Sequence, residues 1–360
     1  MAHFQAKSVS AQVAAHLKDE VAQGEWSGTM PGEERLMRRL GVGAATVREA
    51  LKLLEKEGVL AGQGAGRRRK IVLPENHAPP ALRVGLLHFD PPARSLNYMI
   101  ELHHRLEDAG QTSLDPDKTL IELGMDVSRV ARYVKKIEAD AWIVCSASRE
   151  VLEWFAAQEM PAFALFGRMA GVPLAGAKPD KVSTHAAVAR CLLDHGHRRI
   201  SFLCRHQHRL PEPGRAMRAF LGELEADGIV TAAFNTPDWE EKPEGFERLI
   251  ESLFGGPTPP TALVLDEPIL YYAAHHYLAR RGLQVPAEVS LTCTDSDPDF
   301  AWCKPSVAHI QWDSRPLLHR IMRWVNNVNL GKDDRRQSLT KAEFIEAGTV
   351  GPAPGRQKRS

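Results

Sequence analysis

A hydroxyl group and several guanidinium groups near the amino terminus are spaced in a way that suits contact with a nucleic acid. Thr46 and Arg48 lie two positions apart, and four consecutive basic residues follow at Arg67–Lys70. Hydroxyl and guanidinium groups donate hydrogen bonds to phosphate oxygens and base edges, and a dense cationic run can follow the backbone or the minor groove. These residue types indicate a polyanionic partner for this region.

Two short helical patterns joined by a tight turn must position Thr46 and Arg48. The first pattern buries Leu36 and Leu40, and the turn is Gly41-Val42-Gly43. The second pattern has the apolar spacing of one helical face, with Val47, Ala50, Leu51 and Leu54 on that face and Gly58 as its end. The arrangement predicts a helix-turn-helix, whose second helix enters the major groove.

The flanking segments predict a third helix and a wing. Residues 8–23 carry Val13, Leu17 and Val21 four positions apart, the pattern of an amphipathic helix. After Gly58 we expect a short strand at Val59-Leu60, a glycine-rich turn at 62–66 and a returning strand at 67–72.

In these residues the segment 8–73 resembles the winged helix-turn-helix of GntR-family repressors. The match includes Pro31, Leu40-Gly41-Val42, the run from Thr46 to Gly58 and the glycine-rich wing. The resemblance implies operator DNA as the partner; a winged helix that serves only protein contacts is the alternative. The implied DNA-binding residues are Arg35, Thr46, Arg48, Gly64, Gly66, Arg67, Arg68 and Arg69.

Departures from that family change where the DNA contacts are expected. Gly43-Ala44 stands where the family usually has Ser-Arg after "GV", and Ala65 replaces a common wing-tip arginine. We therefore expect Thr46, Arg48 and the wing run Arg67–Lys70 to make most of the contacts.

The length and composition of the chain indicate that it contains more than a DNA-binding module. The 360 residues suit two or three domains, and 43% hydrophobic residues allow real cores. Net charge is +1 overall, yet residues 1–73 hold twelve basic against eight acidic residues, which fits a polyanion-binding head on a neutral-to-acidic body. No apolar run of about 18 residues and no signal peptide occur, so we expect a cytoplasmic protein without membrane contact.

The remainder of the chain predicts an α/β body behind a linker. Residues 74–82 combine prolines with polar residues, as linkers do. From Arg83 onward, apolar runs alternate with amphipathic helical segments, which indicates parallel α/β sheets, two of them over this length. The expected strands are 83–87, 141–145, 162–166, 200–204, 262–265 and 289–293, and the expected helices 97–109, 149–158, 185–194, 214–227 and 268–281.

This body resembles the LacI/GalR-type effector domain, which has the two-lobed periplasmic-binding-protein fold. The resemblance rests on "RVGLL", on 192–203, on 214–229 and above all on 260–297. It implies lobe 1 at about 83–180 and 310–336 and lobe 2 at about 181–309 and 337–350, with crossovers near 178–184, 305–311 and 335–340 and a flexible tail at 351–360. It also implies a homodimer and a small-molecule effector in the cleft at the carboxyl ends of the strands.

Charged and aromatic residues at strand ends are the candidate effector contacts. Arg215 and Asp295 occupy positions where the family has an arginine and an aspartate, and Asp266 ends the strand 262–265. Charge-assisted hydrogen bonds from such groups suit a polyhydroxylated ligand, most simply a sugar or sugar derivative. Surface or interdomain salt bridges are the alternative role. The weaker candidates are Asp90, Trp302 and Arg168.

Metal, cofactor and catalytic sites are not expected. The histidine pairs at 103–104, 195/197, 206/208 and 275–276 have no carboxylate or cysteine at ligand spacing. The five cysteines are scattered without a C-x-x-C spacing, so we expect reduced core residues. No nucleophile elbow or acid–base constellation occurs either. The sequence thus predicts a repressor that senses a sugar; a ligand-independent regulator, or one that senses another metabolite, remains the alternative.

Overall fold

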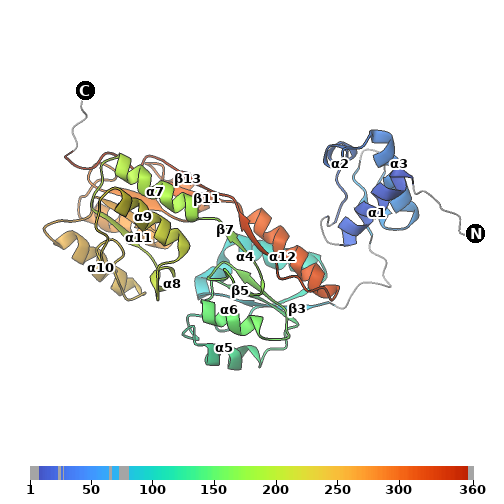
Figure 1. Ribbon diagram of the computed structural model, residues 1–360, viewed down its shortest axis with the longest axis horizontal. Helices are drawn as coiled ribbons and strands as arrows, with labels where there is room; N and C mark the ends of the chain where they lie inside the picture. The colour runs from blue at the N-terminus through green and yellow to red at the C-terminus, as the bar shows by residue number, and fades with distance from the viewer. Residues whose placement is uncertain (1–7, 23–25, 27, 65–66, 73–80, 356–360) are drawn as a thin grey trace, which may run out of the picture. The chain divides into compact units, whose positions relative to one another are not determined.

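The computed structural model describes residues 8–22, 26, 28–64, 67–72 and 81–355 (Figure 1). The chain divides into two compact units: unit 1 comprises Met1–Ala177 and Ser314–Ser338, and unit 2 comprises Lys178–Asp313 and Leu339–Ser360. The first and third of these boundaries lie at or within the crossover ranges expected from the sequence, and the second lies just beyond the expected range of 305–311. The expected linker falls mostly on residues outside the described ones.

The amino-terminal part of unit 1 is a winged helix-turn-helix. It contains α1 (Val9–Ala22), α2 (Glu33–Leu40) and α3 (Ala44–Lys56), followed by the antiparallel pair β1 (Leu60–Ala61) and β2 (Lys70–Ile71). Leu17, Leu36 and Leu51, one from each helix, are buried together. Gly41 ends α2 with a φ of 65°, a left-handed conformation that favours glycine. The returning strand of the wing is shorter than the predicted 67–72, because only Lys70 and Ile71 pair.

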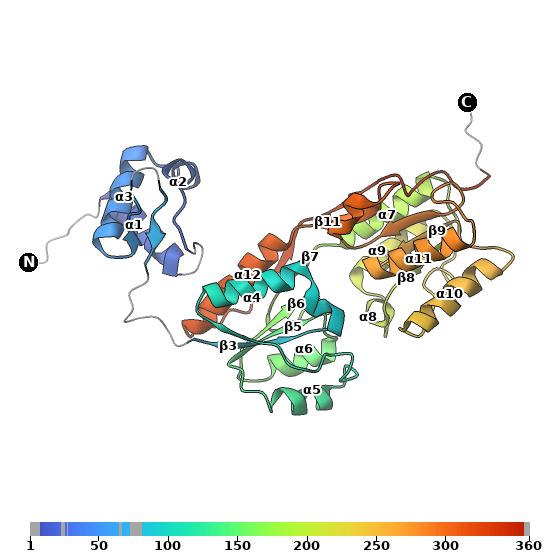
Figure 2. The ribbon, with the colours of Figure 1, turned by 180° about the vertical axis from the view of Figure 1, so that it is seen from behind.

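The rest of unit 1 is a six-stranded sheet with the order β12-β7-β6-β5-β3-β4. Its strands are β3 (Arg83–Leu87), β4 (Thr112–Leu114), β5 (Ala141–Cys145), β6 (Ala162–Leu165), β7 (Ala175–Pro179) and β12 (Gln337–Thr340). The pairs from β4 to β7 are parallel. Helices α4 (Asn97–Asp108) and α12 (Ser314–Asn329) cover one face, and α5 (Val127–Val134) and α6 (Arg149–Ala156) cover the other, as Figures 1 and 2 show.

Unit 2 is a five-stranded sheet with the order β13-β11-β10-β9-β8. Its strands are β8 (Ile200–Leu203), β9 (Ala262–Leu265), β10 (Ser290–Cys293), β11 (Ala308–Trp312) and β13 (Ala342–Ile345), of which β13 runs antiparallel to β11. Helices α7 (Val182–Asp194) and α9 (Arg215–Ala226) pack into one core. Helices α10 (Pro243–Gly255) and α11 (Pro268–Arg280) pack into another. Short helical segments are η2 (Pro91–Ser95), α8 (His206–Arg209) and η3 (Pro298–Trp302).

The predicted fold class is confirmed, with two corrections of detail. The six expected strands are present within a residue or two at their ends, because continuous apolar runs mark strands that are buried on both faces. The prediction of a flexible tail at 351–360 is wrong for its first residues. Gly351 O lies 3.0 Å from His197 Nε2, and Ala353 N donates to His195 O at 2.9 Å. Of the cysteines expected in the core, all are free, but Cys303 is half-exposed.

Among the helices of the described part of the chain, none is long and apolar enough to cross a membrane.

Candidate functional site

The amino-terminal helix α3 presents its polar side chains from its first two turns. Val47, Ala50 and Leu51 are buried, so the helical period leaves Arg48 exposed and Thr46 half-exposed. Gly43 caps the helix with extended backbone and no side-chain bond. The amino-terminal end of α3 is therefore sterically open, since a Cβ added at Gly43 would meet nothing within 4 Å.

Arg48 is held by a carboxylate of the preceding helix. Its Nη2 lies 3.2 Å from Glu33 Oε2, and both side chains remain accessible to water. An exposed ion pair of this kind contributes little to stability and can exchange for another anion such as a phosphate.

The wing separates its basic residues into two groups. Arg67, Arg68 and Lys70 are exposed, whereas Arg69 is half-buried, with its Nε 2.6 Å from Glu55 Oε1 and its Nη1 3.7 Å from Glu33 Oε1. Arg69 thus braces the wing against α2 and α3. Among the predicted glycines, Gly64 has a φ of 97°, which favours glycine, and Gly66 lies outside the described residues.

A polar hollow of about 420 Å³ adjoins these elements. Three of its lining residues are arginines, Arg35, Arg38 and Arg68, and Trp26 and Glu34 are also part of the lining. Arg35 is exposed, and its guanidinium carbon lies 5.7 Å from the centre of the Trp26 ring. The predicted Arg35 therefore shares a cationic surface with the wing.

In unit 2, the carboxyl ends of β9 and β10 bring Asp266 and Asp295 to one edge of the sheet, because these strands are parallel neighbours. Asp266 is buried and accepts a hydrogen bond of 2.7 Å from the backbone N of Arg205 through Oδ2. Its Oδ1 is buried without a hydrogen-bond partner. Burial, followed by the nearby Glu267 carboxylate, raises the pKa of Asp266 well above its usual range.

Asp295 is tied to its surroundings by two side chains. Its Oδ1 lies 3.3 Å from Lys181 Nζ and accepts a 2.5 Å hydrogen bond from Trp312 Nε1. The Lys181 ammonium group also acts on Asp266, since it opposes the rise in the pKa of that carboxyl. The Lys181 ammonium group therefore interacts electrostatically with both predicted carboxylates, Asp266 and Asp295.

The other predicted contacts of unit 2 are less enclosed. Arg215 is exposed at the first position of α9, and Trp302 at the end of η3 is 86% exposed.

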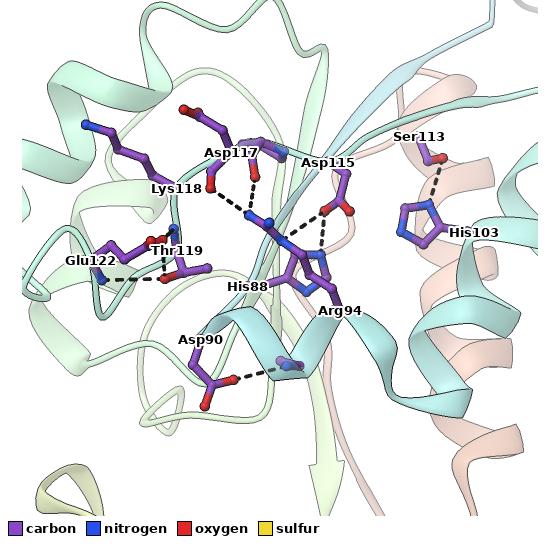
Figure 3. Close-up of polar contacts among 12 residues, drawn as sticks. His88, Asp90, Arg94, His103, Ser113, Asp115, Asp117, Lys118, Thr119 and Glu122 are labelled. Carbon is purple, nitrogen blue, oxygen red and sulfur yellow. Dashed lines mark hydrogen bonds and ion pairs between the residues drawn. The ribbon is translucent and has the colours of Figure 1, made fainter. Parts of the chain in front are cut away.

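The two predicted contacts of unit 1 lie at the ends of its strands. Asp90 lies beyond β3 and caps η2, since its side chain accepts a 3.1 Å hydrogen bond from Ala93 N (Figure 3). Arg168 follows β6, and its backbone N donates to Ala147 O at 3.1 Å. Asp90 therefore has a local structural role, while its position at the strand end matches the expectation.

Lys181 and Arg205 also lie at this edge of the unit 2 sheet but were not among the residues predicted from the sequence. Arg205 lies directly beyond the expected strand 200–204, so its strand-end position was the available signal. Its guanidinium group forms hydrogen bonds of 3.0 and 2.8 Å with Glu267 Oε2. Lys181 precedes α7 far from the other residues in sequence, and only the fold brings it to this edge.

Comparisons with known proteins match both parts of the chain. Residues 9–66 match the family model of bacterial regulatory proteins of the gntR family, and residues 189–346 match a periplasmic binding protein-like domain. Among curated proteins, none matches the chain.

Solved structures of LacI-type regulators share the fold of the larger part. A LacI family transcriptional regulator from Mycobacterium smegmatis is 19% identical with a TM-score of 0.61, over 75% of this chain and 99% of that one. The Escherichia coli transcriptional repressor ascG is 17% identical with a TM-score of 0.58, over 75% and 100%. A LacI-type transcription regulator from Bifidobacterium animalis subsp. lactis is 17% identical with a TM-score of 0.61, over 74% and 99%.

The resemblances stated from the sequence are thereby confirmed. The chain joins a gntR-family DNA-binding domain to a periplasmic-binding-protein-like effector domain of LacI-type fold.

Proposed function

We propose that this transcriptional regulator is a repressor, and that a small polyhydroxylated ligand bound by its effector domain lowers its affinity for operator DNA. The gntR-family domain and the effector-type fold together establish a regulator with two separate parts. The sugar-like ligand, the sign of regulation and the dimer are the proposed elements. The Escherichia coli protein ascG, which has a similar fold, is a transcriptional repressor, and this supports the sign.

The observation that carries the ligand proposal is the buried Asp266 carboxyl. Its Oδ1 has no hydrogen-bond partner in the described part of the chain, although a buried polar atom left unpaired is costly. A ligand hydroxyl would supply the missing partner. Lys181 and Asp295, 3.3 Å apart, offer a cation and a carboxylate at the same edge, the mixture that a sugar with several hydroxyl groups can satisfy.

DNA binding in the proposal depends on Arg48, Thr46 and the exposed wing arginines Arg67 and Arg68. A homodimer would place two such heads on half-sites about one helical turn apart. Ligand binding that favours one arrangement of the effector domain would then change the spacing of the heads.

Calorimetry tests whether the protein binds the proposed ligand. Wild-type protein is titrated with a panel of pentoses, hexoses and nucleosides, and binding to at least one sugar is expected. Asp266→Asn should weaken that binding about ten-fold or more, since it changes an acceptor oxygen into a donor. The control is Asp227→Asn, because Asp227 pairs with Arg198 beyond α9. Absence of heat with every compound would contradict ligand sensing, and heat only with nucleosides would contradict the sugar class.

In vitro selection of duplexes tests the proposed DNA binding. Duplexes enriched from random DNA by the wild-type protein serve as the operator, and binding is measured by fluorescence anisotropy at several salt concentrations. Arg48→Ala should reduce affinity about ten-fold and lower the salt slope. Lys56→Ala, at the far end of α3, is the matched control. The same duplex upstream of a promoter in a transcription assay decides the sign, since transcription that rises on adding the protein would overturn the repressor assignment.

A further inference from the structure

Three potential metal ligands that are distant in the sequence converge in unit 1. His88 directly follows β3, His103 lies on α4, and Asp115 directly follows β4. One side-chain ligand atom of each residue lies within 4.8 Å of the ligand atoms of the other two. Strands β3 and β4 are parallel neighbours, so their carboxyl ends bring His88 and Asp115 together, and α4, which contacts β4, adds His103.

The two imidazole rings are already oriented around the carboxylate. His88 Nε2 lies 2.7 Å from Asp115 Oδ1. His103 Nδ1 lies 2.9 Å from Ser113 Oγ, and Figure 3 shows the second ring nitrogen of His103 turned toward Asp115 and His88. A hydroxyl that accepts the Nδ1–H proton leaves the Nε2 lone pair of His103 available, which is how outer hydrogen bonds orient metal-binding histidines.

His88 is enclosed by the protein, since its side chain is 1% exposed. Its Nδ1 is buried without a hydrogen-bond partner. Asp115 is 39% exposed, which gives an ion a path from solvent to the cluster.

The charges around the cluster leave room for a cation. Arg94 is the nearest cation, with its Nε 3.9 Å from Asp115 Oδ1. Its Nη2, however, donates to the carbonyl oxygens of Pro116 and Asp117, at 2.5 and 2.9 Å. The Nη2 of Arg94 is thus committed to the backbone of the loop after β4, while its Nε keeps the ion pair with Asp115 Oδ1. The second oxygen of Asp115 remains for another partner.

We propose that His88, His103 and Asp115 form a binding site for one divalent transition-metal ion of the Zn²⁺ type. Two imidazole nitrogens and a carboxylate oxygen are a donor set that such ions prefer, and three protein ligands leave a further coordination position for water or a ligand oxygen. On binding, the metal replaces the proton at His88 Nε2, and the ring proton moves to Nδ1. The site is independent of the proposed ligand contacts in unit 2.

A second cluster, Cys191, His195 and Glu346, satisfies the same distance criterion in unit 2. In that cluster His195 Nδ1 lies 2.9 Å from the carbonyl oxygen of Cys191, and His195 Nε2 lies 3.7 Å from Glu346 Oε1. Both ring nitrogens of His195 are thus engaged within the cluster, whereas His103 in unit 1 is oriented by Ser113, which is not one of the three ligands. This difference favours the first cluster.

Titration of the chelator-treated full-length protein with Co²⁺ and Zn²⁺ tests the proposal. Wild-type protein should bind one equivalent, and the visible Co²⁺ spectrum should lack a thiolate charge-transfer band. His103→Ala should weaken binding about ten-fold or more, while His104→Ala, its exposed neighbour on α4, should leave binding unchanged. Asp115→Asn, at an exposed position, should also weaken binding, because it replaces the carboxylate oxygen by an uncharged amide.

Three outcomes would overturn the proposal. Binding by His103→Ala that equals the wild type would exclude the cluster, and so would the absence of stoichiometric binding. A thiolate band that disappears in Cys191→Ser would assign the metal to the unit 2 cluster instead.

Discussion

Arg48 Nη2 on α3 lies 3.2 Å from Glu33 Oε2 at the start of α2, so the arginine expected to contact DNA is paired with a carboxylate within the same domain. Glu33 also lies 3.7 Å from Arg69 Nη1 in the wing. One carboxylate therefore neutralises two of the predicted DNA-binding arginines. A DNA phosphate must therefore compete with the Glu33 carboxylate for these two arginines.

Glu33→Gln should consequently strengthen DNA binding. Removal of this charge frees Arg48 and part of the Arg69 interaction, and we expect affinity for a selected duplex to rise about two- to ten-fold at low salt, with a steeper salt dependence. Fluorescence anisotropy at several salt concentrations measures both. Glu34→Gln removes an equal charge from the adjacent exposed residue and is the control. An equal gain in the two variants would mean that general electrostatics, not the release of Arg48, is responsible.

Asp266→Asn should stabilise the protein near neutral pH. The folded-state pKa of Asp266 is raised above that of the unfolded chain, so the carboxyl is tolerated best below about pH 4 and opposes folding increasingly as pH rises. The amide removes that cost, and we expect a gain in the free energy of unfolding at pH 7 that shrinks towards pH 4. Thermal melts across this pH range test it. A variant less stable than wild type at pH 7 would show that the ionised carboxyl is favourable in this position.

We expect His197 to make the stability of unit 2 fall at acidic pH. It is fully buried, with Nδ1 2.9 Å from Thr261 Oγ1 and Nε2 3.0 Å from both Ser290 Oγ and Gly351 O. Burial lowers the pKa of His197 to about 4, so its contribution to stability is present above pH 6.5 and is lost as pH falls from 6.5 towards 4.

His197→Gln should therefore lower the free energy of unfolding at pH 7 by about 1 to 3 kcal/mol and flatten its fall between pH 6.5 and 5. Urea denaturation at each pH, followed by circular dichroism, provides the measurement, with His104→Gln as an exposed control. If the pH dependence of His197→Gln matches that of the wild type, another group governs the acid sensitivity.

The Arg320–Asp334 ion pair should be essential to the stability of unit 1. Two hydrogen bonds of 2.9 and 2.8 Å join the groups, whose side chains are only 6% and 11% exposed. Arg320→Ala leaves the buried Asp334 carboxylate without its cationic partner and should destabilise the protein by about 3 to 5 kcal/mol in urea denaturation. Arg335→Ala, which breaks the exposed pair with Asp333, should cost less than about 1 kcal/mol. Similar losses in the two variants would show that burial of the pair is unimportant.

Local patterns were sufficient to predict the elements that carry their own signal. The spacing of Leu36, Val47 and Leu51 gave a helix-turn-helix, and these side chains do form its core. Apolar runs such as 83–87 and 141–145 became strands because a strand buried on both faces needs a continuous apolar sequence. Edge elements were missed: β4 and β12 have partly exposed residues and therefore weak apolar patterns.

Residue patterns along the chain were enough to predict the order of its parts: a basic winged helix-turn-helix, followed by the strands and helices of an α/β body. Periodicity and turn residues act over a few positions, so they can be read along the chain. The tertiary structure decided which side chains meet. Lys181 reaches Asp295, Glu33 pairs with Arg48, and Asp115 joins His88 and His103, because parallel strands and packed helices bring residues together that no local pattern relates.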